Sequence, residues 1–362
     1  MNNLLVTGGA GFIGSNFIYY WLNKYRDDHI VVIDALTYAG NRYNLLKADK
    51  NDQFEFIHGN ILDQKLIEDL LCRKKIDTIV HFAAESHVDR SIHSPDDFIN
   101  TNIVGTHTLL KAAKSVWLDS NLNHRFHHIS TDEVYGSLDP DDSPFSEKTP
   151  YSPNSPYAAS KAASDHLVRS YHKTYGLNVT ISNCSNNYGP FQFPEKLIPL
   201  IIVNILLGKP LPIYGDGNQI RDWLHVDDHN YGVELILKNG NSGETYNIGG
   251  NNEWKNIDIV KYICKLIDGY FLRHPEMKKI FPNAPQGDKK KAETLIYHIE
   301  DRKGHDKRYA INAEKITNHF DFSPKESFET GIKKTLDWYL ANVEWWSQIM
   351  DGNYRKWIET NY

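Results

Sequence analysis

Short apolar runs alternate with helix-length segments through the first half of the chain. Runs with strand character lie at 3–7, 29–34, 53–59, 77–84, 125–130 and 177–183. Segments with helical spacing lie between them, at 14–25, 64–74, 100–117 and 158–175. Strands that alternate with helices are typical of βαβ units, in which a parallel sheet carries helices on both faces. The pattern therefore predicts an α/β fold built on a doubly wound parallel sheet.

The pattern changes after residue 183. The stretch NNYGPFQFPEKLIP is rich in proline, glycine and aromatic residues and predicts a shaped loop that leads into a helix. Helical spacing returns at 256–268 and 328–346, and the segment 282–293, with its three consecutive lysines, predicts an exposed loop. We expect a sheet domain over 1–185, with a return segment at about 225–250. Residues 186–362 would mainly form a smaller lobe over the carboxyl edge of the sheet, where open α/β sheets bind ligands.

Composition narrows the class of protein. The 362 residues carry a formal net charge of -6, which argues against a general nucleic-acid-binding surface. Cys72, Cys184 and Cys264 form no C-x-x-C pair, so we expect neither a disulfide framework nor a zinc site, and a reducing cytosol fits. The predicted strand at 3–7 leaves no room for a signal peptide. No apolar run is long enough to span a membrane, so we expect a cytoplasmic protein without membrane or nucleic-acid partners.

A glycine motif follows the first predicted strand. In TGGAGFIGS, Gly9, Gly11 and Gly14 satisfy G-x-G-x-x-G, and Gly8 with the latter two satisfies a related spacing. The motif opens a predicted helix, and Asp34 follows at the end of the second strand, which is the context of the Rossmann dinucleotide fingerprint. Asp34 would accept hydrogen bonds from a ribose and repel a 2′-phosphate, which favours NAD over NADP. The plain alternative is a glycine-rich turn with a solvated aspartate.

A tyrosine and a lysine four residues apart form a second candidate. Tyr157 and Lys161 share one helix face, at the start of a helix that follows the strand ending at 130. The same spacing at Tyr20/Lys24 and Tyr43/Lys47 is most simply accidental. An ammonium beside the phenol, together with a nicotinamide cation, would lower the tyrosine pKa. The phenol would then act as a base that takes a proton from an alcohol during hydride transfer.

Two adjacent acids follow the fifth predicted strand. In HHISTDEVYG, Asp132 and Glu133 come directly after Thr131. Taken alone, this stretch is most simply a capping turn in solvent. A reaction that eliminates water across neighbouring carbons, however, needs one protonated and one ionised group a few ångströms apart, and burial can arrange that difference.

The chain resembles the extended short-chain dehydrogenase/reductases and, within them, the dTDP-glucose 4,6-dehydratases. The resemblance covers nearly the whole chain and rests on TGGAGFIGS, HFAAESHVDRS, ISTDEVYG, YAASK, NNYGPFQFPEKLIP, YGDGNQIRDWLHVDD, YNIGGNNEWKN and DRKGHDKRYAI. It implies a tightly bound NAD⁺, a dTDP-glucose substrate and a place in deoxysugar synthesis such as that of rhamnose. It also implies that Asp132 is the acid of the elimination, that Glu133 is its base, and that Thr131 binds the hydroxyl on carbon 4.

The resemblance assigns further residues. It implies cofactor contacts at Gly8, Gly11, Phe12, Ile13, Gly14, Asp34, Asn60, Ile61, Ala83, Ala84, Thr101, Tyr157, Lys161 and Asn187. It implies substrate contacts at Ser86, Thr131, Asn186, Lys196, Leu197, Tyr214, Arg221, Asn256, Arg302 and His305. The sequence departs from the family pattern at Asn60, where aspartate is common, and at Lys303, where proline is usual. The segment 271–293 is longer than usual and has no assigned role.

Alternatives remain open at this point. A UDP-glucose 4,6-dehydratase or a 4-epimerase would share the glycine motif and the Tyr–Lys pair, although an epimerase has no use for the paired acids. A non-catalytic NAD-sensing module has no need to keep Tyr157, Lys161 and both acids. The sequence does not separate thymidine from uridine nucleotides.

Metal binding and assembly complete the expectations. The seventeen histidines form no compact ligand motif, so we expect no metal. His81, His127 and His128 lie in strand-like runs and are expected to be structural. In the family, helices such as 100–117 and 158–175 pair into a four-helix interface, which implies a homodimer. The small residues Ala158, Ala159, Ala162 and Ala163 would permit close approach there.

Overall fold

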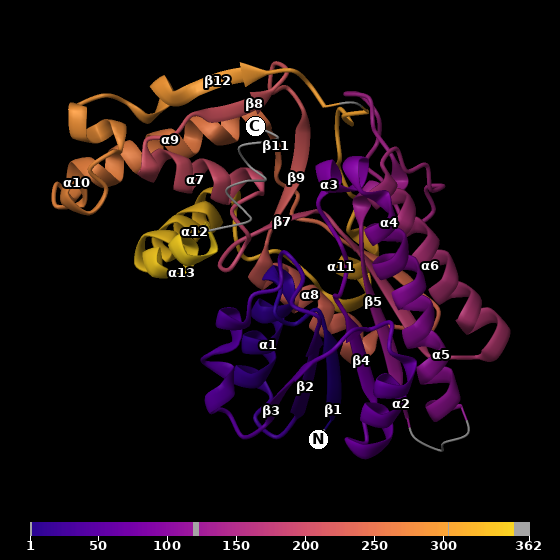
Figure 1. Ribbon diagram of the computed structural model, residues 1–362. Coiled ribbons are helices and arrows are strands. Elements are labelled where there is room, and N and C mark those ends of the chain that lie inside the picture. The colour runs from indigo at the N-terminus through magenta and orange to yellow at the C-terminus, as the bar shows by residue number, and fades with distance from the viewer. Residues whose placement is uncertain (1, 119–122, 303, 351–362) are drawn as a thin grey trace.

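The structure, a computed structural model, describes residues 2–118, 123–302 and 304–350 (Figure 1). Within these ranges, seven strands form one sheet in the order β10-β6-β5-β4-β1-β2-β3. All neighbours in this sheet are parallel. The strands are β1 (Asn3–Thr7), β2 (His29–Asp34), β3 (Phe54–His58), β4 (Thr78–His81), β5 (Arg125–Thr131), β6 (Val179–Cys184) and β10 (Thr245–Ile248). The predicted doubly wound α/β fold is confirmed.

Helices cover both faces of this sheet. On one side lie α1 (Phe12–Lys24), α8 (Val226–Asn239) and α11 (Glu314–Phe320), and on the other α2 (Gln64–Arg73), α5 (Thr106–Trp117) and α6 (Pro156–Tyr175) (Figure 1). Successive strand residues point to opposite faces. Accordingly, Leu4 and Val6 belong to the core under α1 and α8, and Leu5 belongs to the core under α5. The chain returns to the sheet with α8 and β10, and again with α11.

A second lobe lies over the carboxyl edge of the large sheet (Figure 1). Its small sheets have the orders β11-β9-β7 and β12-β8. Their strands are β7 (Asn186–Tyr188), β8 (Leu211–Tyr214), β9 (Ile220–His225), β11 (Glu253–Lys255) and β12 (Ile296–Ile299). The helices are α7 (Leu197–Leu207), α9 (Asn256–Arg273), α10 (Met277–Ile280), α12 (Phe328–Ala341) and α13 (Val343–Ile349). They enclose a separate hydrophobic core. The short helices α3 (Val88–His93) and α4 (Pro95–Phe98) pack on α6, and α3 also contacts the second lobe through Asp89 and Arg302.

Three predicted elements need correction. The segment 100–117 is a π-helix (Ile99–Gly105) followed by α5, and Gly105 packs so closely that a Cβ there would lie 2.4 Å from Ile61 Cδ1. The segment 328–346 is two helices, interrupted at Asn342. The loop 282–293 is only partly exposed, because Gln286 is buried and donates to Asp268 at 2.6 Å. Its three lysines are exposed, as predicted.

Two further observations concern assembly and compartment. Ala158 and Ala162 are buried within the chain, so they are not available as the close-approach surface predicted for them. Ala159 is exposed and Ala163 is half-buried. Cys72, Cys184 and Cys264 are free thiols. None of the described helices has the length and apolar character needed to cross a bilayer. Lys303 lies outside the described residues.

Candidate active site

A cavity of about 440 Å³ opens between the two lobes, along the carboxyl edge of the large sheet. Apart from Gly9 of the glycine motif, every residue that was predicted for cofactor, substrate or chemistry lines it, from Gly8 after β1 to His305 after β12. These residues are distant in sequence and come together because parallel strands end at one edge, which the second lobe covers. The cavity is therefore the candidate site, and its two ends differ in character.

The first end is shaped by glycine. Gly8 has φ +69°, and a Cβ there would lie 2.6 Å from Ala83 Cα; a Cβ at Gly14 would lie 2.4 Å from the Gly8 oxygen. α1 starts after Gly11, with no side-chain cap and no acidic residue in its first turn. The backbone N–H groups and the positive end of the helix dipole are thus presented to the cavity, which suits a pyrophosphate. These residues fit a dinucleotide.

Asp34 stands beside this turn, at the end of β2. Its Oδ2 accepts the Ala10 N–H at 2.8 Å and its Oδ1 accepts the Leu36 N–H at 2.8 Å. Burial raises the pKa of this carboxyl, and the two backbone donors oppose the rise. The carboxylate is held in one orientation, as an acceptor for ribose hydroxyls. Asn60, also at this end, uses its Oδ1 to accept the Leu62 N–H at 2.9 Å.

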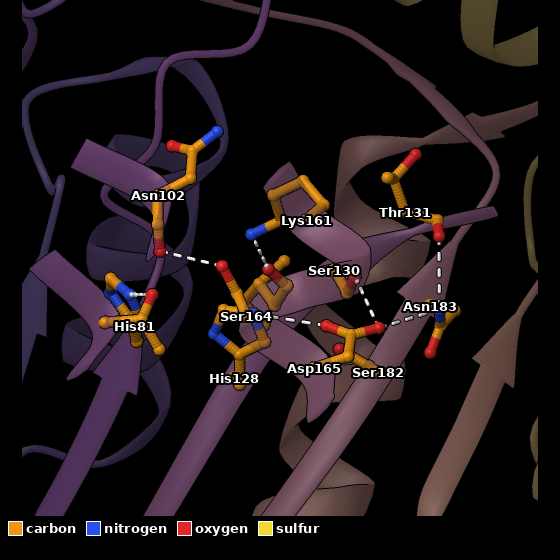
Figure 2. A network of polar contacts seen from close by, with 12 residues as sticks. His81, Asn102, His128, Ser130, Thr131, Lys161, Ser164, Asp165, Ser182 and Asn183 are labelled. Atoms are coloured by element: carbon orange, nitrogen blue, oxygen red, sulfur yellow. Dashed lines mark hydrogen bonds and ion pairs between the residues drawn. The ribbon is translucent and has the colours of Figure 1, made fainter. Parts of the chain in front are cut away.

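Tyr157 and Lys161 enter from α6. The Ser155 hydroxyl caps this helix by accepting the Ala158 N–H at 3.1 Å, and Pro156 follows, which suits a first helical position. Tyr157 therefore lies in the first turn, facing the cavity. Lys161 Nζ extends toward β5 and donates to the Ile129 carbonyl at 2.7 Å (Figure 2).

The expected pKa of Tyr157 needs correction for the chain by itself. Burial raises the pKa of Tyr157 well above its usual value, Glu133 adds to the rise, and a hydrogen bond with Thr131 opposes it. Burial also lowers the pKa of Lys161 to about 8, because the same surroundings disfavour its ammonium form. Desolvation therefore outweighs the attraction that the sequence argument relied on. The charge that favours a phenolate has to come in part from the cofactor.

The paired acids lie at the end of β5, in a short 3₁₀ turn (Asp132–Tyr135). Thr131 Oγ1 accepts the Glu133 N–H at 3.3 Å and donates to Asp132 Oδ1 at 3.3 Å. Thr131 thus caps the turn, and the acids do not. Asp132 is 1% exposed, and its Oδ2 is buried with no hydrogen-bond partner among the described residues. The simple alternative of a solvated capping turn is wrong.

The two acids have different electrostatic surroundings. Burial raises the pKa of Asp132 well above its usual range, and the neighbouring Glu133 raises it further. Burial also raises the pKa of Glu133, but Lys196, Arg221 and Arg302 oppose the rise. A carboxyl near cations ionises before a carboxyl near another acid. The arrangement therefore favours a protonated Asp132 beside an ionised Glu133.

The second end of the cavity is cationic. Lys196 Nζ donates to the Ser86 carbonyl at 2.8 Å, so the structure joins two residues that were predicted to contact substrate. Arg302 lies over the Tyr214 ring, 4.9 Å from its centre, and Arg221 lies over the Tyr309 ring at 4.1 Å. Guanidinium groups held in this way suit phosphate recognition.

Some residues of this end were missed by the sequence analysis. Asp89 Oδ2 accepts a hydrogen bond from Arg302 Nη2 at 2.8 Å. Glu195, which is 3% exposed, precedes Lys196, and its Oε2 lies 3.5 Å from Arg90 Nε. Asp306 supplies a backbone oxygen to Arg221 at 3.0 Å, and Asp301 lies 2.7 Å from His305. The signal was present, since Asp89 and Glu195 stand within HVDRS and FPEKLIP, but only the cations there were considered.

The buried strand histidines His81 and His127 contact hydroxyl groups. His81 contacts the hydroxyls of Thr7 and Thr106, and His127 contacts those of Thr180 and Ser182, all within buried strands and helices. Their structural role is confirmed. In the part of the chain that the structure describes, no three His, Cys, Asp or Glu residues are grouped so that they hold a metal ion.

Comparison with known proteins adds independent information. Residues 5–335 match the family model described as GDP-mannose 4,6 dehydratase. A dTDP-glucose 4,6-dehydratase from Escherichia coli is 51% identical over 363 residues, which covers 97% of each chain. A protein of the same name from Neisseria meningitidis serogroup B is 49% identical and covers 98% of each chain. The family model and the relatives share 4,6-dehydration and differ in the nucleotide and the sugar that are named.

Solved structures of similar proteins have the same fold. A dTDP-glucose 4,6-dehydratase from Streptomyces venezuelae, solved with NAD and TYD bound, superposes with a TM-score of 0.84 at 45% identity, over 96% of this chain and 99% of that one. A Bacillus anthracis dTDP-glucose 4,6-dehydratase in complex with NAD gives 0.83 at 44%, over 96% and 100%. A UDP-glucuronic acid 4-epimerase from Bacillus cereus gives 0.78 at 30%, over 94% and 99%.

Proposed function

The chain belongs to the dTDP-glucose 4,6-dehydratase family, and on that basis we propose that it converts dTDP-glucose to dTDP-4-keto-6-deoxyglucose. The observation that carries the proposal is the acid pair at the end of β5: Asp132 is buried, Glu133 is half-buried, and both line the same cavity as Tyr157. Oxidation at carbon 4 makes the hydrogen on carbon 5 acidic. One ionised and one protonated carboxyl then suffice to remove water across carbons 5 and 6.

Different residues of the cavity carry out different steps of the proposed reaction. Bound NAD⁺ supplies a hydride acceptor for carbon 4 and, once reduced, a hydride donor for carbon 6. Tyr157 takes the proton of the hydroxyl on carbon 4, and Thr131, one residue before the acids, hydrogen-bonds the same hydroxyl. Glu133, near three cations, takes the proton from carbon 5. Asp132, whose Oδ2 has no hydrogen-bond partner among the described residues, protonates the hydroxyl that leaves carbon 6.

The nucleotide end of the substrate fits the cationic end of the cavity. Lys196, Arg221 and Arg302 would neutralise the pyrophosphate, and each is already oriented by a neighbour within the chain. Tyr214 lies beside Arg302 and offers a flat surface near the nucleoside. A thymidine nucleotide is proposed because relatives of about half identical sequence bear that name.

A 4-epimerase is the second candidate, and one finding favours it: the fold is shared with the Bacillus cereus epimerase at 30% identity. An epimerase reaction, however, breaks no bond at carbon 5. Burial of Asp132 without a chemical use would be costly, since an unpaired buried polar oxygen costs about 1–3 kcal/mol and its Oδ2 has no hydrogen-bond partner among the described residues. The buried Asp132 beside Glu133 therefore supports dehydration.

The test is to incubate the purified protein with dTDP-glucose and, separately, with UDP-glucose, and to follow carbon 6 by NMR. A methyl doublet of a 4-keto-6-deoxy sugar, formed faster from dTDP-glucose, is expected. Formation of a galactose nucleotide with carbon 6 unchanged would overturn the proposal in favour of an epimerase. Faster turnover of UDP-glucose would overturn the nucleotide assignment alone. Tyr157→Phe serves as the matched control and should form neither product.

We also propose a cytosolic homodimer. The π-helix Ile99–Gly105, which leads into α5, exposes Ile99 by 47% and Val104 by 42%, and α6 exposes Ala159 nearby. These helices lie together on one outer side of the sheet (Figure 1). An apolar strip on paired helices suits a helix-to-helix interface between two copies. The three free thiols fit a reducing compartment.

A further inference from the structure

α6 carries three buried ionisable side chains at intervals of four residues, Tyr157, Lys161 and Asp165, and the half-buried Arg169 and exposed Lys173 continue the spacing. Residues at this spacing lie on one face of a helix, and the three are 8%, 4% and 0% exposed. Tyr157 and Lys161 line the cavity, whereas Asp165 lies one turn further along and does not. A fully buried carboxylate is costly unless a nearby cation or several hydrogen bonds compensate it.

Asp165 is the centre of a polar cluster that joins α6 to β5 (Figure 2). Its Oδ2 accepts from the Ser130 hydroxyl at 3.0 Å, and its Oδ1 lies 3.3 Å from His128 Nε2. Lys161 donates to the carbonyl of Ile129 at 2.7 Å. The helix thus contacts three consecutive residues of β5, His128 to Ser130, through Lys161 and Asp165, just before the turn that carries the paired acids.

Two more groups complete the surroundings of Asp165. The Tyr151 hydroxyl donates to Oδ2 at 2.7 Å, and Arg169 in turn donates to the Tyr151 oxygen at 2.6 Å. Asn183 on β6 donates to the Thr131 carbonyl at 3.1 Å and lies 3.5 Å from Asp165 Oδ2. His128, Lys161 and Tyr151 all favour the ionised carboxylate and, despite burial, lower the pKa of Asp165.

The charges around Lys161 show what this carboxylate does. The titratable neighbours are Tyr157 and Asp165 on α6, His128 on β5, Cys184 on β6 and His81 on β4. Burial lowers the pKa of His128 to about 4 and that of His81 well below its usual value. Burial raises the pKa of the Cys184 thiol to about 12. At neutral pH these three are uncharged, so among this set Asp165 supplies the negative charge opposite the Lys161 ammonium.

We propose that Asp165 is a positioning residue for the oxidation step: its buried carboxylate keeps Lys161 cationic beneath Tyr157 and fixes both to the end of β5. The proposal rests on the proposed function for its kinetic consequence. A cation beside Tyr157 favours the phenolate that accepts the proton from carbon 4. Without the charge of Asp165, Lys161 would lose its proton at lower pH than in wild type. The rate of oxidation would then begin to fall at a lower pH on the alkaline side of its profile.

The first experiment reads Lys161 directly and needs no turnover. The purified holoenzyme is exposed to trace acetic anhydride between pH 6 and 11, and acetylation of Lys161 is quantified by mass spectrometry. In Asp165→Asn, which keeps the shape and removes the charge, the midpoint should fall by about one pH unit or more, as expected for loss of a neighbouring opposite charge. An unchanged midpoint overturns the proposal.

Tyr151→Phe is the matched control, because it removes one hydrogen bond to the same carboxylate oxygen and leaves the charge in place. Its Lys161 midpoint should remain within a few tenths of a pH unit of wild type. If Tyr151→Phe lowers the midpoint as much as Asp165→Asn does, the effect is a loosening of the fold and the proposal is wrong. Should Asp165→Asn fail to fold, Asp165→Ser is measured in its place, with the same two outcomes.

The second experiment reads oxidation alone. In a Glu133→Gln background, where the reaction stops before elimination, reduction of bound NAD⁺ by dTDP-glucose is followed by absorbance. Adding Asp165→Asn should move the alkaline limb of the pH–rate profile to lower pH by the same amount as the labelling midpoint. Asp165→Glu should restore the wild-type profile. A uniform loss of rate without a shift overturns the proposal. If wild type makes no keto sugar, the proposed function fails, whereas the labelling result still decides the role of Asp165.

Discussion

Glu133→Gln tests whether the two neighbouring acids have different chemical roles. The substitution keeps the size of the side chain and removes the proposed base for carbon 5. A general base contributes about 10²–10⁴-fold to the rate, or about 3–5 kcal/mol of barrier, so product should form that much more slowly. Lys196 keeps Glu195 as a counter-charge, and Arg302 keeps Asp89. Substrate binding should therefore survive, and the first hydride transfer with it.

The assay separates oxidation from elimination. Mixed with dTDP-glucose, Glu133→Gln should still reduce part of its bound NAD⁺, seen as absorbance near the reduced-nicotinamide band. In D₂O, deuterium should enter carbon 5 slowly or not at all. Asp132→Asn keeps the base and loses the acid, so carbon 5 should exchange with solvent while water leaves carbon 6 slowly. The two variants thus have opposite exchange patterns.

One outcome would refute this reasoning. Loss of a helix cap costs about 0.5–2 kcal/mol of stability. If both variants lost only that much stability and turned over at the wild-type rate, the acids would be structural. The geometry already argues against a capping role, because Thr131 accepts the Glu133 N–H. Normal turnover of both variants would remove the main support for dehydration.

Three further predictions concern the first step, the cofactor and the assembly. Tyr157→Phe should lower turnover by about 10²–10⁴-fold without accumulation of reduced cofactor or keto sugar, measured by absorbance and NMR; a near-wild-type rate would contradict its role as base. Wild type should bind NAD more tightly than NADP in calorimetry, and Asp34→Ala should narrow the difference; equal affinities in wild type would show that the ribose argument is wrong. Light scattering at micromolar concentration should give a dimer, and Val104→Glu, on the exposed strip, should give a folded monomer; a monomeric wild type would count against the interface.

Much of the fold followed from local sequence patterns. β1 and β2 begin and end at the predicted residues, because their apolar runs are bounded by abrupt polar or glycine-rich segments. α6 starts at Pro156, two residues before the predicted start at 158, although Ser155 and Pro156 are strong signals for the earlier start. The predicted helix at 100–117 was wrong in its first part, because the π-helix there accompanies the close packing of Gly105 on Ile61, which is distant in sequence.

The electrostatics of the site depended on distant contacts and were not predictable in the same way. Glu133 is influenced by Lys196 just before α7, Arg221 on β9 and Arg302, and Asp89 pairs with Arg302 across 213 residues. The sequence argument expected Lys161 and a nicotinamide cation together to lower the pKa of Tyr157. Within the chain alone burial raises this pKa, and the Tyr–Lys spacing does not reveal the depth at which the pair is buried. Asp165 lies at the same four-residue spacing, yet its partners Ser130, Tyr151 and His128 become visible only in the folded chain.

The most direct test of the central claim follows one hydrogen through the reaction. In the proposed reaction the hydride removed from carbon 4 returns to carbon 6 of the same sugar. Wild-type protein is therefore incubated with dTDP-glucose that carries deuterium at carbon 4, and the product is examined by NMR. Deuterium is expected in the carbon 6 methyl group of the keto sugar. Deuterium that stays on carbon 4, as in an epimerase, or that is lost to solvent would contradict the proposed reaction.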